Sequence, residues 1–306
     1  MKLYFYSISF FLSLFLLSCK NTSHQDATKK YQFALHLSAG AKYYFNINTE
    51  TVSRVLVAGK DMETNSQSEI GLIYEVVGSS PDSIQVKITY DQLKFAIKGK
   101  DGQKEIDAAN SGHSFDDMEK QLAAIKGASV YVVLNKKGEV LEVTGNKEIA
   151  DKLVTTLHVT NPASESRLRE QFKKFIGDDF IRNNLSSQFS LFPDTAVVVG
   201  DSWILKNKLS SDVEVDASST CTFDDLDGKL ATVTSAAQIN TDDKLTITGT
   251  EVPASIKGSQ KGKFITDIGT GLLMEAKTTI ALEGSVQSMG KDYPLSIKIT
   301  KLITSK

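Results

Sequence analysis

The clearest indication of the fold is the stretch LSIKITKLI, residues 295–303, near the C-terminal end of the chain. Apolar and polar side chains alternate along it, and successive side chains of a β-strand point to opposite faces of a sheet. One face of this strand is therefore expected to be buried while the other meets solvent. The pattern predicts a half-buried strand in an antiparallel sheet.

Similar strand signals recur from residue 31 onward, because β-branched and aromatic residues are concentrated in runs between turn residues. Tight hairpins are expected around residues 135–138 (NKKG) and 224–228 (DDLDG), whereas residues 258–262 (GSQKG) are interpreted as a polar loop. The predicted strands are residues 43–49, 70–77, 83–97, 130–134, 139–143, 202–209, 229–239, 244–250, 262–268, 272–282 and 295–303.

Helical periodicity replaces this pattern in the middle of the chain. Ser114 is a good N-cap for a first helix, which Gly127 ends. Asn146 is expected to cap a second helix, and a third begins near Ser164 and ends at Gly177. The sequence therefore predicts helices between two groups of strands.

The predicted fold class is α+β and dominated by β, with two similar curved antiparallel sheets and a helical segment between them. Residues 31–145 form the first β-rich half with one inserted helix, and residues 192–306 form the second half. Residues 146–191 are the helical connector, with a fourth helix expected at residues 180–189.

The two β-rich halves resemble each other locally. Gly40 and Gly200 each precede an aromatic strand start, and Gly138 and Gly271 begin the similar runs GEVLE and GLLME. The number of residues between Gly40 and Gly200 exceeds that between Gly138 and Gly271 by about the length of the segment that holds the first helix. Two explanations remain open, namely an internal duplication with an insertion and the general similarity of hairpin-rich sequences.

The N-terminus has the composition of an export signal. Lys2 supplies the positive charge, and residues 3–17 form an apolar run that is shorter than the about 20 residues needed to span a membrane. Such a run suits the hydrophobic region of a signal peptide. The alternatives are an uncleaved anchor or an ordinary signal peptide followed by a chance cysteine.

The end of this run, residues 16–19 (LLSC), resembles the lipobox of bacterial lipoproteins. The resemblance implies that residues 1–18 are a lipoprotein signal peptide and that Cys19 is the lipid attachment site and the new N-terminus. Two or three acyl chains would hold the body durably, since each buried methylene contributes roughly 0.8 kcal/mol. Residues 19–30 are polar and aperiodic, which predicts a flexible tether.

Lipoprotein sorting signals suggest a location. An Asp directly after the lipidated Cys favours retention at the inner membrane, and this chain has Lys20 there, so the resemblance implies the bacterial outer membrane. In relatives from Bacteroidota-type bacteria an acidic run directs export to the cell surface. The tether holds only Asp26, so a periplasm-facing, lipid-anchored protein is expected.

Charge and cysteine content exclude some classes of function. The formal net charge of -2 provides no basic face for nucleic acid, so none is expected as a partner. With Cys19 acylated, Cys221 has no intrachain partner for a disulfide. Its alternating context predicts a small buried strand residue. Trp203, at a strand start, is likewise expected in the core.

The residues that could carry catalysis or bind metal do not cluster in sequence. The four histidines are His24, His36, His113 and His158, and the acidic pairs are Asp116-Asp117, Asp178-Asp179, Asp224-Asp225 and Asp242-Asp243. No two histidines have zinc-ligand spacing. Residues 225–228 begin like a calcium loop but continue into a strand, which favours a hairpin turn. We therefore expect no catalytic residue, metal or cofactor.

The mature region resembles an uncharacterised family of β-rich envelope lipoproteins of Bacteroidota-type bacteria. The resemblance rests on the lipobox, Gly40, Gly200, the run VVGDSW at residues 198–203 and the closing strands. That family has no activity to transfer. The expected function is non-enzymatic binding by a lipid-anchored envelope protein, with the membrane and an unknown protein or small apolar ligand as partners. The alternatives are a half-barrel carrier of an acyl ligand and a hydrolase with an unrecognised site.

Overall fold

A computed structural model describes residues 28–100, 102–109, 117–189, 192–208, 213–214, 216–241, 244–247, 250–288 and 290–306. The signal peptide, Cys19 and most of the tether lie outside these ranges. So do His24, His113, the predicted cap Ser114, and the acidic residues Asp116, Asp242 and Asp243.

The described strands form one 14-stranded antiparallel sheet, which confirms the β-dominated α+β class. Its order from one edge to the other is β6-β5-β3-β2-β1-β14-β13-β12-β10-β9-β7, with β4 beside β3, and with β11 joining β12 to β8. The strands are β1 (Lys42–Val57), β2 (Lys60–Ser79), β3 (Ser83–Gly99), β4 (Gly102–Asp107), β5 (Ser129–Asn135), β6 (Val140–Thr144), β7 (Ser202–Lys208), β8 (Val213–Glu214), β9 (Asp216–Asp227), β10 (Leu230–Thr241), β11 (Lys244–Ile247), β12 (Thr250–Asp267), β13 (Leu272–Ser288) and β14 (Lys291–Ser305).

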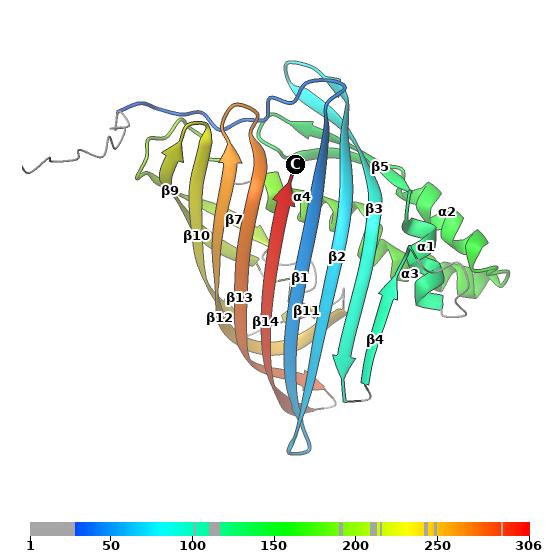
Figure 1. Cartoon of the computed structure of the whole chain (residues 1–306). Helices are drawn as coiled ribbons and strands as arrows, with labels where there is room; N and C mark the ends of the chain where they lie inside the picture. The colour runs from blue at the N-terminus through cyan, green and yellow to red at the C-terminus, as the bar shows by residue number, and fades with distance from the viewer. Residues whose placement is uncertain are drawn as a thin grey trace, which may run out of the picture.

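The first and last strands join the two β-rich halves in the middle of the sheet (Figure 1). β1 pairs with β14 from Phe45 opposite Ser305 to Val55 opposite Leu295. The halves therefore lie in one continuous sheet, whereas the sequence predicted two similar sheets. The pairing has a physical reason, because two separate sheets would leave β1 and β14 as long unpaired edges.

Four helices are described: α1 (Asp117–Ile125), α2 (Asn146–Thr156), α3 (Pro162–Ile176) and α4 (Asp178–Phe189). In Figure 1 α4 lies behind β14 and β1, and the other three lie beyond β3 and β4. We call the face of the sheet that carries the helices and the buried side chains the inner face, and the opposite face the outer face. No helix of the described residues is long and apolar enough to cross a membrane.

The predicted helix ends are confirmed, one predicted cap is wrong, and the third helix begins two residues before Ser164. Gly127 follows α1 with φ 75° and Gly177 caps α3. Asn146 makes no capping hydrogen bond, because Gly145 with φ 97° occupies the N-cap of α2. The third helix begins at Pro162, and the side chain of Asn161 accepts hydrogen bonds from the Ala163 and Ser164 amides. Proline suits the first turn, where its missing N–H costs nothing.

The main core lies between the upper inner face, the helices and the N-terminal segment 31–37. Tyr74 of β2 donates a hydrogen bond from its hydroxyl to Gln188 Oε1 of α4 at 3.0 Å, and both residues are buried. Segment 31–37 crosses between two turns, because Leu35 donates its N–H to Lys136 and His36 donates its N–H to Thr270, each at 2.8 Å. These bonds connect the two halves at one end of the sheet.

The two glycines that suggested a duplication occupy corresponding positions. Gly40 donates its N–H to Val76 on β2, and Gly200 donates its N–H to Phe223 on β9, each at 2.7 Å. Each acceptor therefore lies on the strand that pairs with the one following the glycine. A duplication of the whole halves stays a prediction.

A predicted loop is the middle of a strand. Residues 258–262, interpreted as a polar loop, belong to β12, where Gln260 is buried. Its side-chain oxygen accepts a hydrogen bond from Ser219 at 3.1 Å, and its side-chain nitrogen donates one to Ser235 at 3.4 Å. Gly258 is required by close approach, since a Cβ there would lie 2.1 Å from the Ala281 carbonyl oxygen. The glycine therefore indicates packing and not a turn.

Candidate functional site

Cys221 lies on β9 with 1% of its surface exposed, which confirms that it is a small buried strand residue. Desolvation by burial raises the pKa of its thiol to about 11. The nucleophilic form of cysteine is the thiolate, so this residue is unsuited to catalysis near neutral pH.

We expect Cys221 to be unreactive toward a thiol-specific disulfide reagent in the folded protein at about pH 8, where a free cysteine reacts readily. In denaturant one thiol per chain should react if Cys19 is acylated. The absorbance of the coloured product that the reagent releases gives the number of reactive thiols in the folded and in the denatured protein. Fast labelling of the native protein would contradict the buried position. Two reactive thiols in denaturant would contradict acylation of Cys19.

The other candidate residues of the sequence do not converge. His36 and His158 are exposed. Gly228 and Lys229 form the tight turn of the predicted hairpin, and Asp227, the last residue of β9, pairs with Leu230 of β10. Trp203 packs against the core, 6.3 Å between ring centroids from Phe33, which confirms its core assignment. Within the described residues no three His, Cys, Asp or Glu side chains form a group that could hold a metal ion.

Two surfaces of the sheet remain as candidate sites. The first is the lower part of the inner face, below the helices in Figure 1. A second apolar cluster, which we call the lower cluster, lies there on β10, β12, β13 and β14. Its buried members are Ile239, Ala254, Ile256, Ile280, Leu282, Leu295, Ile297 and Ile299.

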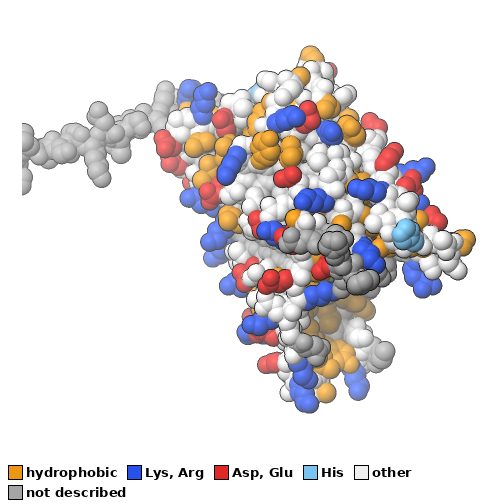
Figure 2. Space-filling view, turned by 45° about the vertical axis from the view of Figure 1, so that its right-hand side comes forward, with side chains coloured by type: hydrophobic (Ala, Val, Ile, Leu, Met, Phe, Trp, Pro, Cys, Tyr) orange, Lys and Arg blue, Asp and Glu red, His pale blue; other side chains and the backbone are white. Residues whose placement is uncertain are grey.

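Two exposed apolar side chains lie on the inner face beyond the lower cluster, one on β2 and one on β3. Met62 lies opposite Val55, which packs against the cluster, and Met62 is 48% exposed. Ile97 follows Phe95 by two residues, so it faces the same inner side, and it is 40% exposed. Figure 2 shows hydrophobic side chains set back in a recess at the lower end of the molecule. Thr64 and Ser66 lie between Met62 and Ile97 on the inner face of β2, so these two are separate exposed apolar positions on a partly polar surface.

The second surface is a hollow of about 790 Å³ that runs across β14, β1, β2, β3 and β4. Residues of both faces line it: Thr49, Ser68, Phe95 and Ile106 point to the inner face and are joined by Glu119 of α1, and the remaining residues form two rows that point to the outer face. Most of the side chains in these two rows are polar. The rows are Leu302, Asn48, Glu69, Lys94, Asp107 and Thr300, Glu50, Gln67, Ala96, Glu105. Acidic groups predominate, with Lys94 paired to Asp107 at 3.8 Å.

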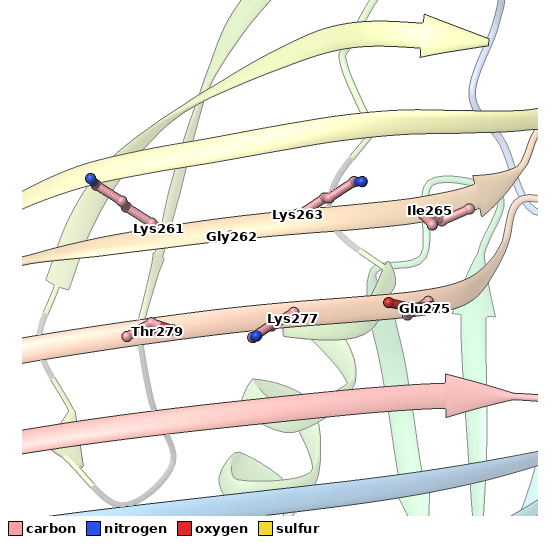
Figure 3. A pocket seen from close by; sticks show the side chains of 7 residues that line it. All are labelled: Lys261, Gly262, Lys263, Ile265, Glu275, Lys277 and Thr279. Carbon is pink, nitrogen blue, oxygen red and sulfur yellow. The ribbon is translucent and has the colours of Figure 1, made fainter.

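The same two rows continue onto β13 and β12, where they carry cations. Lys277 lies beside Leu302 and opposite Lys263, and Thr279 lies beside Thr300 and opposite Lys261. A shallower hollow of about 280 Å³ is lined by these residues together with Glu275 and Ile265 (Figure 3). Sequence reasoning missed this site because residues 258–262 were interpreted as a loop. The spacing of Lys257, Lys261 and Lys263, all an even number of residues apart, is the signal that could have placed them on one face of a strand.

Comparison with known proteins shows a family and a fold. Residues 81–273 match a family of unknown function, DUF6263. No curated protein matches the chain. A structure of lipovitellin, titled for its lipid–protein interactions, is similar with a TM-score of 0.52 and 10% identity over 89% of this chain. The match spans a quarter, 25%, of that longer chain.

Two further structures are similar only weakly. The first is an outer membrane channel from Pseudomonas putida F1, with a TM-score of 0.25 and 7% identity; the match covers 90% of this chain and 98% of that chain. The second is the translocator domain of the autotransporter NalP from Neisseria meningitidis. The latter has a TM-score of 0.21, 6% identity and coverage of 88% and 89%. At such scores neither structure supports a functional argument.

Proposed function

The chain belongs to DUF6263, a family of unknown function, and we propose that it is a non-enzymatic, lipid-anchored envelope protein that binds an acyl chain on its inner face. The observation that carries the proposal is the pair of exposed apolar side chains on the inner face, Met62 and Ile97, of which Met62 lies beside the buried lower cluster. The proposal places the protein at the outer membrane, attached through Cys19 and facing the periplasm.

An exposed apolar surface beside a core is a cost for a soluble protein, because contact with water is unfavourable by about 25 cal/mol per Å². The helices that pack on the main core cover only the upper inner face. On the lower inner face no helix of the described residues covers the apolar side chains, so their methyl and methylene groups are available to a ligand. An acyl chain would bury these groups and bring no polar atom that needs a partner.

The shape of the surface favours a thin ligand. A stable protein interface buries about 800 Å² on each partner, so it needs a surface that a folded domain can reach. The lower inner face is instead recessed below the helices (Figure 2). A flexible hydrocarbon chain reaches such a recess more readily than a folded protein does. The lipovitellin structure supports this choice, because it shares the fold and is described by its lipid–protein interactions.

Two charge substitutions test the proposal. We expect Met62→Glu and Ile97→Glu each to weaken binding of a fluorescent fatty acid about tenfold or more, equivalent to ~1.4 kcal/mol, because the carboxylate would have to lose water against the hydrocarbon. Titration of the probe into the purified full chain in detergent measures the affinity. Both positions are already exposed by 48% and 40%, so the fold should tolerate the changes.

Leu56→Glu is the matched control. Leu56 is 38% exposed and lies one residue from Val55, so it faces the outer side of the same strand. The control should bind the probe like the wild type, and solvent extraction followed by mass spectrometry should recover a lipid from the wild type. Equal affinity of all three variants for the fatty acid would contradict the acyl-binding role. So would a wild-type protein that co-purifies with another protein and no lipid, if Met62→Glu displaces that partner.

A further inference from the structure

We propose a second, separate binding site on the outer face, where Lys261, Lys263 and Lys277 hold a phosphate-type anion. The three lysines are exposed and line the shallower hollow together with Thr279. This site is on the opposite face from the proposed acyl surface, so the two proposals stand independently.

The register brings two like charges directly together. Lys263 of β12 lies opposite Lys277 of β13, and Lys261 is the diagonal neighbour of Lys277. Directly opposite residues of an antiparallel pair have Cβ atoms about 5 Å apart, and like charges there are destabilising. The two ammonium groups therefore repel each other, and either an anion bound beside them or their pointing apart reduces that repulsion.

Elsewhere the sheet follows the opposite rule. Among the described registers, every other pair of charged residues directly opposite one another joins a cation to an anion. Two of these form ion pairs on the same outer face, Lys42 with Glu75 at 3.3 Å and Arg54 with Glu63 at 2.7 Å. The pair Lys263 and Lys277 departs from a pattern that the rest of the sheet keeps.

The lysines have one neighbouring acid, which forms no ion pair with them. Glu275 is the one carboxylate among the lining residues, and it lies opposite Ile265. In the described part of the chain none of the three ammonium groups lies within 4.0 Å of a carboxylate oxygen. Figure 3 shows the ammonium groups of Lys263 and Lys277 pointing away from each other, Lys263 toward β10 and Lys277 toward β14.

The chemistry of the hollow suits phosphate. A phosphate group has several acceptor oxygens and up to two negative charges, which lysine binds as a point charge. The Thr279 hydroxyl can donate a hydrogen bond to one of these oxygens. The hollow, about 280 Å³, is open to solvent, so the phosphate can belong to a soluble compound or to a lipid headgroup.

Titration calorimetry with two probes tests the site and distinguishes the two sources. The full chain in non-ionic detergent is titrated with inorganic phosphate and, separately, with a short-chain phosphatidic acid, with short-chain phosphatidylcholine and chloride at equal ionic strength as references. We expect at least one phosphate probe to bind above the references. Binding of phosphatidic acid alone assigns the site to a lipid headgroup, and binding of both probes assigns it to the phosphate group itself.

Lys277→Thr is the diagnostic variant, because it removes the repulsion together with the site. We expect its phosphate affinity to fall about tenfold while its melting temperature without phosphate stays equal or rises. Lys298→Thr is the control, since Lys298 is exposed on the outer face of the neighbouring strand and lies outside the hollow. No binding of either probe, or equal losses in the two variants, would overturn the proposal.

Discussion

Phe223→Ala is expected to lower the free energy of unfolding by about 3–5 kcal/mol, the range for removing a fully buried aromatic side chain. Phe223 has 0% of its surface exposed and lies on β9 near one edge of the sheet. Its ring contacts Phe33 edge-to-face with centroids 5.3 Å apart and Tyr31 at 5.9 Å. Alanine would leave a cavity that two other rings border.

The loss should extend to the N-terminal segment, because two of the three rings belong to residues 31–37. Urea unfolding measures the stability, and hydrogen exchange measures whether the Leu35 N–H, bonded to Lys136, loses protection. Ile204→Ala is the control, since Ile204 is 67% exposed on β7 and should change stability by no more than about 0.5 kcal/mol. Similar losses for both variants would contradict a core role for Phe223.

The fold class followed from alternation, and the failures have a common cause. The closing strand was predicted because buried Leu295, Ile297 and Ile299 alternate with residues of the outer face. Residues 60–69 also form a strand but were not predicted. Their sequence KDMETNSQSE is polar on both faces, because the helices do not cover this part of the inner face. Alternation disappears where neither face is buried.

The pairing of strands that are distant in the chain could not be predicted from the sequence. No local pattern shows that β1 lies beside β14, although that contact turns two sheets into one. The glycines of β12 resembled loop residues, because the backbone contact that requires Gly258 comes from Ala281 on another strand. The cap of α2 moved from Asn146 to Gly145 for a similar reason. A Cβ at Gly145 would lie 3.0 Å from the Ser129 carbonyl oxygen.

The candidate surfaces were less predictable than the core. Lys263 and Lys277 are brought together by the hairpin of β12 and β13, so their repulsion is visible only once the register is known. Met62 and Ile97 lie on adjacent strands, and their exposure on one face follows from the sheet order and from the helices that leave that area open. The anchor at Cys19 needs no tertiary structure, and it stays a prediction from the sequence.

Raising the pH from about 10 to about 12 is expected to destabilise the protein by roughly 1.4 kcal/mol per pH unit through Tyr74. Tyr74 is 2% exposed, and burial is the main cause that raises the pKa of its phenol far above the ordinary 10.0. The unfolded chain would release this proton near pH 10.0 while the folded protein keeps it. Stability is therefore fully present below that pH and is lost as the pH rises.

Tyr90 adds to the slope with the same sign, since burial raises its pKa to about 12. Its contribution should be smaller than that of Tyr74, because the residue is only half-buried and water screens part of the effect. Urea midpoints measured across this pH range report the combined slope. The slope should exceed that of a chain whose tyrosines are exposed.

Tyr74→Phe separates this titration from general alkaline unfolding. At neutral pH the variant should be less stable by about 1–3 kcal/mol, because it lacks the hydroxyl that donates a 3.0 Å hydrogen bond to the buried Gln188 Oε1. Above about pH 10 its stability should fall less steeply than that of the wild type, since one buried phenol no longer titrates. The two curves should therefore converge as the pH rises. Parallel curves would mean that the Tyr74 phenol ionises equally easily in the folded and unfolded chain, which contradicts its burial.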